Sequence, residues 1–440
     1  MKTIQYMGSK QSLLSFLEGS IDHFITSISQ RFPTLIKTKP RTFFDGFAGS
    51  GRVSYYFRNR YQIFSNDKLS FSKVILSAYL NNPYPPSHYK NYIKDLNNLD
   101  IEFFQQCDGW FTKTYGGEWN QGRSEDEFGV KKVWLNKNAR RIDMARLQIT
   151  RWREEEQISE IEESVLLLAL ILAVNKVSNV VGHQNGYLKR WCQAAQRDIH
   201  LELPQLEKCS RRSQHQHFVG DIFEQLPKIE TDIAYFDPPY GTNNKNLVVA
   251  TRYSSFYHLW NTLVTNERPQ TFGKASKPIH TKGYTEPLER NKREVVMPKF
   301  IRLIEESRSS IVAFSYSNKG LLTALDFEVI YRLAGCEMST FRIYMTEHRA
   351  NKQSQIAKKS GEWIDRANPN APLAEYLIIA CKDPLRFASP LRTSPLQSDG
   401  DLEKLPELET WLSQSEDYTL PQSTWLYNTE SMSFQGLTQT

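Results

Sequence analysis

Two stretches of the chain alternate short apolar runs with segments whose apolar residues recur at helical spacing. In the first stretch, helices are predicted over 13–24 and 53–57, and strands over 42–45 and 61–65. The second stretch has short runs rich in β-branched and aromatic residues, which predict strands at 218–221, 231–236, 310–317, 327–331 and 375–380. Alternation of this kind is typical of an α/β fold with a mixed, mainly parallel sheet.

The pattern breaks off at Asn81–Pro86, and the chain becomes largely polar and helical up to about residue 160. We therefore predict one domain formed by residues 1–83 and 216–382, an inserted and mostly helical region at 84–215, and a tail at 383–440. Within the insertion, the apolar run from Ser164 to Val174 is expected to be a core helix.

Composition is ordinary for a globular protein, with 440 residues, 40% hydrophobic and 24% charged. The five cysteines form no CxxC pair, which argues against a zinc site or a disulfide framework and fits a reducing cytoplasm. No signal peptide is recognised at the N-terminus, and the longest apolar run is too short to span a bilayer. We therefore expect neither a metal nor a membrane as a partner.

The net charge of +6 is unevenly distributed along the chain. From Asp383 onward there are 9 acidic and 3 basic residues, so residues 1–382 carry a net +12. A basic body favours a polyanionic partner. Arg140, Arg141 and Arg146 fall on one side of a predicted helix and are candidates for phosphate contacts, with a merely solvated basic helix as the alternative.

Asp237-Pro238-Pro239-Tyr240 directly follows the predicted strand 231–236. The prolines end the strand and fix their own φ, because neither can donate a ladder hydrogen bond. The turn offers a carboxylate, carbonyl acceptors and an aromatic ring, which suit a planar base with an exocyclic amine. A plain strand-ending turn is the alternative for this tetrapeptide considered alone.

A glycine-rich turn, Asp45 to Gly51, lies between the first predicted strand and the next helix. Glycines allow a ligand to approach the backbone closely, and the helix N-terminus supplies free N–H groups. The second strand ends in Asn66-Asp67, where an acid can accept hydrogen bonds from ribose hydroxyls. Together these features predict a site for a cofactor that contains a nucleoside.

Three further segments are candidates for ligand contact. The glycine-rich loop from Gly182 to Trp191 is interpreted as facing DNA, although His183 has no neighbour at metal-ligand spacing. The long polar stretch 241–290 is interpreted as mobile or facing the substrate. Residues 346–372, rich in Lys, Arg, Asn and Gln, are a candidate hairpin or loop directed at a polyanion.

An ordered set of short blocks resembles the Dam-type (class D12) adenine-specific DNA methyltransferases. The blocks are Tyr6-Met-Gly-Ser-Lys10, Asp45-Gly-Phe-Ala-Gly-Ser-Gly51, Asn66-Asp67, Gly220-Asp221, Asp237-Pro-Pro-Tyr240 and Phe314-Ser-Tyr-Ser. The resemblance covers about 1–80 and 165–382, fades in 84–160 and is absent from the tail.

The resemblance implies a Rossmann-like methyltransferase fold, S-adenosylmethionine as cofactor, and N6-methyladenine in double-stranded DNA as product. It also implies a target-recognition role for 84–215, a bacterial or phage origin, and a cognate restriction endonuclease as a candidate partner. When the family's residue roles are carried over by position, the residues that would contact the cofactor are Tyr6, Lys10, Asp45, Phe47, Gly49, Gly51, Asp67 and Asp221. The target base would contact Asp237, Pro238, Pro239 and Tyr240.

Three alternatives stay open at this point. Cytosine-N4 methyltransferases resemble this family but more often carry Ser at the first position of the tetrapeptide, so Asp237 favours adenine. RNA methylation uses related motifs. A DNA-binding module that has lost its activity is the third, against which the intact Lys10, Asp67 and Asp237 argue.

Overall fold

The computed structural model describes residues 1–384 except 5, 7, 181–183, 185–187, 208–214, 242–252, 285, 349–354, 358–362 and 366–372, together with the backbone of 425–428 and 433–436. The chain packs as two compact units. Unit 1 comprises Met1–Gln11, Ala48–Asp221 and Tyr253–Tyr284, and unit 2 comprises Ser12–Phe47, Ile222–Arg252 and Thr285–Thr440.

Unit 2 is built on a mixed β-sheet. Its strands run in the order β15 (Ser433–Gly436), β14 (Trp425–Asn428), β10 (Arg342–His348), β13 (Leu373–Cys381), β9 (Ile311–Ser317), β6 (Ile233–Phe236) and β1 (Thr42–Asp45). β1, β6 and β9 are parallel, whereas β13 and β10 are antiparallel to their neighbours. Asp45 pairs with Tyr235, so β1 and β6 end at the same edge.

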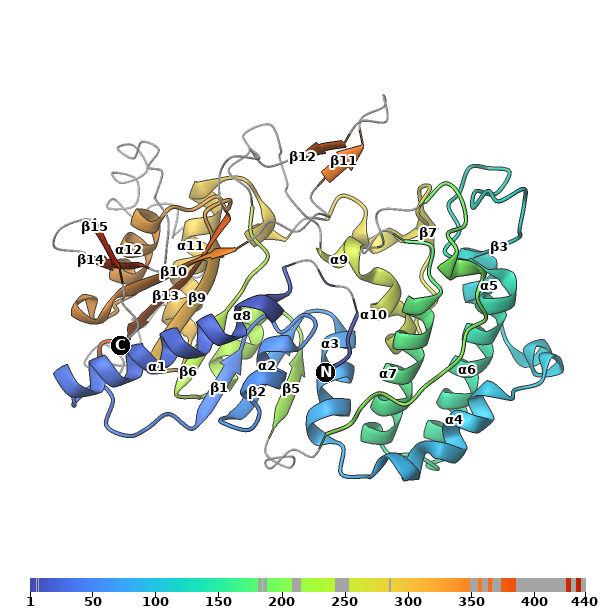
Figure 1. The fold of residues 1–440 in the computed structure, drawn as a ribbon, viewed down its shortest axis with the longest axis horizontal. Helices are drawn as coiled ribbons and strands as arrows, with labels where there is room; N and C mark the ends of the chain where they lie inside the picture. Colours follow the sequence, from blue (N-terminus) through green and yellow to red (C-terminus); the bar gives the residue numbers. More distant parts are fainter. Residues whose placement is uncertain are drawn as a thin grey trace. The chain divides into compact units, whose positions relative to one another are not determined.

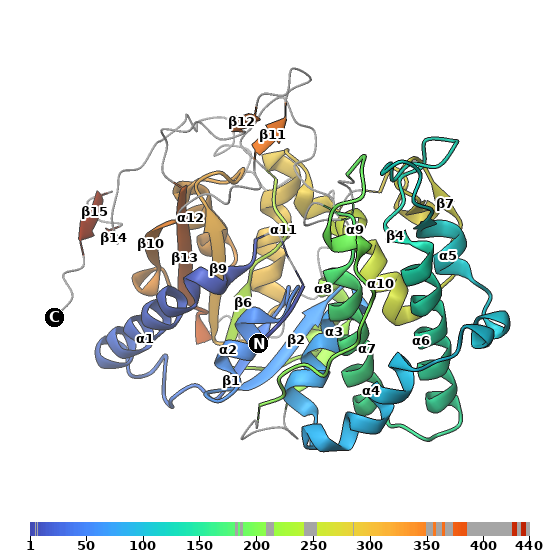
Figure 2. The ribbon, with the colours of Figure 1, turned by 45° about the vertical axis from the view of Figure 1, so that its right-hand side comes forward.

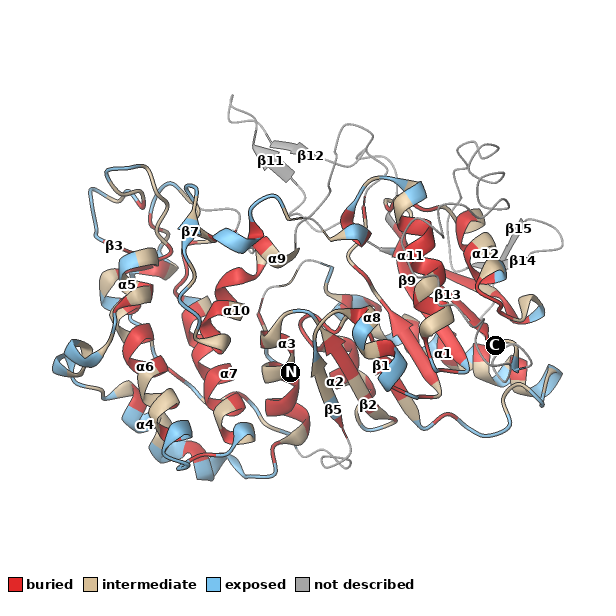
Figure 3. Cartoon of the chain, turned by 180° about the vertical axis from the view of Figure 1, so that it is seen from behind, coloured by how far each residue is buried: buried red, intermediate tan, exposed pale blue. Residues whose placement is uncertain are grey.

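Helices cover both faces of this sheet. The helix α1 (Leu14–Arg31) lies across one face, while α11 (Arg293–Glu306) and α12 (Ala324–Leu333) lie across the other (Figures 1 and 3). All seven residues of β9 are buried, as expected for a strand covered on both sides. α1 turns Leu17, Ile21 and Phe24 into the core, which confirms the helical spacing predicted for 13–24.

Unit 1 combines a parallel strand pair with a group of helices (Figure 2). β2 (Gln62–Asp67) pairs with β5 (Gln216–Val219), and Asp67 lies opposite Val219. The longer helices are α2 (Arg52–Phe57), α3 (Ser70–Leu76), α4 (Lys90–Asn97), α5 (Trp110–Tyr115), α6 (Asn136–Glu154), α7 (Glu160–Lys176) and α10 (His258–Thr265). After α3 the chain continues as a π-helix at Ser77–Asn81. Two short strand pairs join β3 (Gly116–Gly117) to β4 (Trp134–Leu135) and β7 (Thr271–Phe272) to β8 (Lys277–Pro278).

The apolar run at 164–174 lies in α7 and is core, as predicted. Ser159 and Glu162 form a capping box that satisfies backbone N–H groups at the start of this helix. Val165 to Ile171 are all buried, and the helix is red over most of its length in Figure 3. Among the described residues, no helix is long and apolar enough to cross a membrane.

The prediction of a strand at 327–331 is wrong, because these residues lie in α12. Thr323 and Asp326 form a capping box that starts a helix, and Phe327, Ile330 and Tyr331 are buried at helical spacing. The sequence analysis also missed β10, although a hairpin was one alternative for 346–372. β11 (Gln355–Ala357) and β12 (Trp363–Asp365) do pair antiparallel there, whereas 349–354, 358–362 and 366–372 lie outside the described residues.

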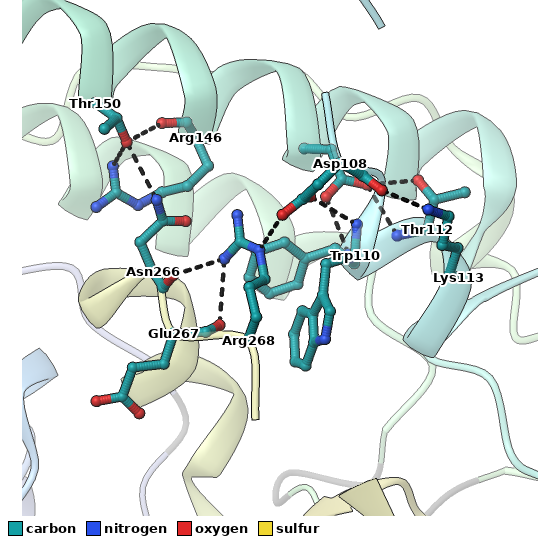
Figure 4. Close-up of polar contacts among 11 residues, drawn as sticks. Asp108, Trp110, Thr112, Lys113, Arg146, Thr150, Asn266, Glu267 and Arg268 are labelled. Atoms are coloured by element: carbon teal, nitrogen blue, oxygen red, sulfur yellow. Dashed lines mark hydrogen bonds and ion pairs between the residues drawn. The ribbon is translucent and has the colours of Figure 1, made fainter. Parts of the chain in front are cut away.

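Of the three arginines of α6 that were candidates for phosphate contacts, Arg146 is buried within the protein. Arg146 is 4% exposed and donates hydrogen bonds to the carbonyls of Leu263 and Val264 at 3.0 and 3.2 Å. Figure 4 shows the Arg146 side chain beside Thr150, which is also in α6, and near Asn266, which directly follows α10. Arg140 lies over the Phe104 ring, and Arg141 donates to the Leu99 carbonyl. Arg146 therefore packs against α10, whereas Arg140 and Arg141 are half-buried beside residues 99–104, and phosphate contact by these two stays a prediction.

Two of the three candidate contact segments are packed in part. Within 241–290, α10 and Ser255 of α9 (Tyr253–Phe256) lie in the core of unit 1, and Tyr257 and Trp260 are buried, whereas Thr271 and Gly273 are exposed. The interpretation as mobile is therefore wrong for α10, and the interpretation of 241–290 as facing the substrate stays a prediction. In the loop 182–191, Gln184 and Trp191 are buried, while 182–183 and 185–187, including His183, lie outside the described residues.

Candidate functional site

In unit 1, the turn after β1 is a loop whose shape requires glycine. Gly49 and Gly51 have φ of +52° and +75°, in the left-handed region that other residues adopt only at a cost. Ala48 N donates to the Asn66 carbonyl at 2.9 Å, which ties the loop to the end of β2. A Cβ on Gly49 would lie 2.8 Å from the Tyr6 ring, so glycine is also needed for packing.

Asp67 holds this loop in place through its carboxylate. Gly49 N donates to Oδ2 at 2.8 Å, and Leu69 N donates to Oδ1 at the same distance. Burial of the carboxylate raises the pKa of Asp67 to about 6, although hydrogen bonds from Leu69, Gly49 and Lys68 oppose the shift. Because each oxygen still has a further lone pair, the ionised group can both hold the loop and accept from a ligand hydroxyl.

Tyr6 belongs to a group of four aromatic rings. It stacks on Tyr257 with ring centroids 4.4 Å apart and an interplanar angle of 16°. Tyr253 and Phe71 lie at centroid distances of 6.0 and 6.4 Å from it. Neither Phe71 nor the contact between Tyr6 and Tyr257 was predicted from the sequence. Tyr257 lies far along the chain from Tyr6, in a segment interpreted as mobile or facing the substrate.

The other two predicted residues of unit 1 lie at the ends of elements. Lys10 begins a short 3₁₀ helix, Lys10–Leu13, and is 5% exposed. Asp221 follows β5 after Gly220, whose N donates to the Asp67 carbonyl at 3.1 Å. Parallel pairing of β2 with β5 therefore brings Asp67 and Asp221 to the same edge. We call Tyr6, Gly49, Gly51, Asp67 and Asp221 the glycine-loop site.

In unit 2, Asp45 and Phe47 flank the end of β1. Asp45 is 1% exposed, and Gly46 N donates to the Tyr235 carbonyl at 2.9 Å. The Phe47 ring packs edge-on against Phe236, with centroids 6.3 Å apart. Because β1 and β6 end side by side, Asp45 and Asp237 are brought to the same edge of the sheet.

Asp237, Pro238, Pro239 and Tyr240 leave the carboxyl end of β6 as predicted; we call them the proline-turn site. The Tyr240 ring packs on Tyr316 of β9 at a centroid distance of 4.4 Å. Tyr316 is fixed in turn, since its hydroxyl accepts from Leu322 N at 3.1 Å. This support lies in the block Phe314-Ser-Tyr-Ser, to which the sequence analysis assigned no role.

Gly241, immediately after the turn, was also missed. A Cβ at this position would lie 2.7 Å from the Arg290 carbonyl oxygen, so the residue after Tyr240 must be glycine for the chain to pass. Its position directly after the tetrapeptide was the available signal. Among the described residues, no cluster of three His, Cys, Asp or Glu side chains could hold a metal ion.

Comparison with known proteins was informative over most of the chain. The family described as D12 class N6 adenine-specific DNA methyltransferase matches residues 6–312. Type II methyltransferase M.FokI of Planomicrobium okeanokoites is 30% identical over 369 residues, covering 82% of this chain and 52% of that protein. Modification methylase LlaI of Lactococcus lactis subsp. lactis is 28% identical, covering 79% of this chain and 53% of that protein.

A shorter relative aligns over nearly its full length. Type II methyltransferase M.NlaIII of Neisseria lactamica is 27% identical, covering 79% of this chain and 96% of that protein. The chain thus spans about half the length of M.FokI and LlaI, but almost all of M.NlaIII.

Proposed function

Because the chain belongs to the D12 class N6 adenine-specific DNA methyltransferases, we propose that it transfers a methyl group from S-adenosylmethionine to N6 of adenine in double-stranded DNA. The family also fits the α/β fold, whose mixed, mainly parallel sheet and Rossmann-like methyltransferase organisation were predicted from the sequence. The observation that carries the proposal is the proline-turn site, which lies at the carboxyl end of a buried strand within the matched region.

The glycine-loop site fits a nucleoside-containing cofactor. Left-handed glycines at 49 and 51 leave the backbone open to close approach, and Asp67 presents a carboxylate suited to a ribose diol. We assign cofactor contacts to Tyr6, Lys10, Asp45, Phe47, Gly49, Gly51, Asp67 and Asp221. When bound, S-adenosylmethionine supplies a methyl group on a sulfonium, which is the electrophile of the reaction.

The proline-turn site would act on the target base. Extruding an adenine from the duplex costs a few kcal/mol, of which stacking on Tyr240 returns about 1–3 kcal/mol. The amine of adenine is a weak nucleophile because its lone pair is delocalised into the ring. Hydrogen bonds from this amine to the Asp237 carboxylate and the Pro238 carbonyl stabilise the positive charge that develops on nitrogen as it attacks.

The prolines favour this role because they limit the backbone conformations and hydrogen bonds of the turn. Neither Pro238 nor Pro239 has an N–H group that competes for acceptors, and both have fixed φ. The acceptors are therefore held where the charge appears, which lowers the barrier without later rearrangement. Methyl transfer then depends on in-line positioning of the amine.

Biological context is part of the proposal. The relatives are named as type II and modification methylases, which supports a role in restriction and modification with a cognate endonuclease as partner, in bacterial or phage cytoplasm. We also keep 1–83 with 216–382 as the catalytic domain and 84–215 as the target-recognition region.

Methyl transfer with labelled S-adenosylmethionine tests this proposal. The protein is incubated with double-stranded DNA or with RNA, and the products are digested to nucleosides and separated. Label in N6-methyldeoxyadenosine is the expected result. Label in N4-methyldeoxycytidine or only in RNA would contradict it, and DNA binding without any transfer would indicate a binding module.

A further inference from the structure

The helix that follows Asp67 has its first backbone N–H satisfied by a distant residue. α3 begins at Ser70, and its N-cap Leu69 has no side chain that can accept a hydrogen bond. Instead, Ser70 N donates to Oδ1 of Asn261 in α10 at 2.7 Å. α10 packs against α3 within unit 1 (Figures 1 and 2), so Asn261 replaces the missing cap.

α10 is itself held at both ends. At its start, Leu259 N donates to Oε1 of the buried Gln184 at 2.7 Å. At its end, Arg146 donates to the carbonyls of Leu263 and Val264. These contacts limit rotation and sliding of the helix, so Asn261 presents its acceptor from a fixed position.

Asn261 accepts from Ser70, and the neighbouring residue Leu69 contacts the Asp67 carboxylate that holds the glycine loop. Leu69 N, next to Ser70, donates to one oxygen of Asp67, and the other oxygen accepts from Gly49 N. Tyr257, which lies between α9 and α10, stacks its ring on Tyr6, and the Tyr6 ring lies beside Gly49. A shift of Ser70 would therefore move Leu69 and disturb the Asp67 carboxylate.

We infer that Asn261 is a positioning residue for cofactor binding, acting through Ser70 and Leu69 on the Asp67 carboxylate. It does not touch the cofactor in this role. The inference rests on the proposed function, since it requires Asp67 to hold the cofactor. The α9–α10 segment, which follows the proline turn in the chain, would thus stabilise the glycine-loop site.

Calorimetric titration with S-adenosylhomocysteine tests the inference without depending on turnover. Asn261→Ala removes the acceptor and should weaken binding about fivefold, the size of a lost cap. Asn261→Asp keeps an acceptor for Ser70 N and should bind within about twofold of the wild-type protein. Thermal melting of each variant is recorded, and titrations are made well below the transition.

Asn97→Ala is the matched control. Asn97 is another half-buried asparagine of unit 1, and its amide pairs with Leu201 through bonds of 3.0 and 2.9 Å. Its loss should lower the melting temperature and leave affinity unchanged. Wild-type affinity in Asn261→Ala, weak binding in a folded Asn261→Asp, or equal weakening in Asn97→Ala would overturn the inference. Failure of the wild-type protein to bind would instead contradict the proposed function.

Discussion

The glycine-loop site and the proline-turn site are held in shape by different means. In the glycine-loop site, backbone N–H groups of Gly49 and Leu69 are fixed by one ionisable carboxylate, that of Asp67. In the proline-turn site, rings fix the backbone at Pro238 and Pro239, and Tyr240 packs on the buried Tyr316. The first site should therefore respond to pH and to loss of its acid, whereas the shape of the second should not.

The largest effect is expected at Asp237. Asp237→Ala should lower kcat by about 10²–10³, by analogy with the loss of one charge-stabilising group, because the carboxylate acts as charge develops on the base. Affinity for S-adenosylhomocysteine should be unchanged. Single-turnover methyl transfer measures the rate. A wild-type rate in the variant would show that the tetrapeptide is only a strand-ending turn.

Two glycine substitutions of the same size should separate the sites. Gly49→Ala places a Cβ against the Tyr6 ring at a φ of +52°, so affinity for S-adenosylhomocysteine should fall about tenfold or more. Gly241→Ala pushes on the Arg290 carbonyl and should slow turnover while leaving that affinity intact. Calorimetry and steady-state kinetics on both variants check this. An equal loss of affinity in the two variants would contradict the assignment of cofactor binding to the glycine-loop site alone.

A pH effect should be confined to the glycine-loop site. Burial raises the pKa of Asp67 to about 6, and the ionised carboxylate is the form that accepts hydrogen bonds. Cofactor affinity should thus fall about tenfold from pH 7 to pH 5, as the carboxylate is protonated. Asp67→Asn should bind more weakly at pH 7 and lose this dependence; a parallel pH profile in the variant would assign the titration to another group.

The same raised pKa has the opposite consequence for stability. The folded state holds the proton of Asp67 more tightly than the unfolded state does, so this carboxyl favours folding below about pH 4. Its contribution is lost as the pH rises through about 6. Binding and folding thus make opposite demands on one side chain, which is common where a buried charge serves a ligand.

The smallest effect on DNA binding is expected at Arg146. Its guanidinium is buried against α10 and neighbours Glu163, so Arg146→Met should lower the melting temperature yet leave the salt dependence of DNA binding unchanged. Binding isotherms at several salt concentrations test this. A weaker salt dependence of DNA binding in a folded Arg146→Met variant would indicate that Arg146 contacts phosphate after all.

Local backbone rules explain which parts of the structure could be predicted from the sequence. Glycine permits left-handed backbone angles and proline fixes its own φ wherever these residues occur, so the turns after β1 and β6 could be predicted. The five residues 327–331 were too few to distinguish a strand from a helix, and the capping box at Thr323 was overlooked.

Longer-range features left weaker signals. The direction in which Arg146 points depends on α10, more than a hundred positions later in the chain. The stack of Tyr6 on Tyr257 joins residues about 250 positions apart, which no local pattern encodes. The roles assigned to the site residues stay predictions, which the binding and rate measurements test.

Single-turnover transfer at saturating S-adenosylmethionine, measured on Asp67→Asn and Asp237→Asn, tests the division between the two sites most directly. Asp67→Asn should recover a rate within a few-fold of the wild-type protein once the cofactor is saturating, because its loss is one of affinity. Asp237→Asn should remain slow by about 10² or more at every cofactor concentration. A slow Asp67→Asn at saturation, or a fast Asp237→Asn, would contradict the account.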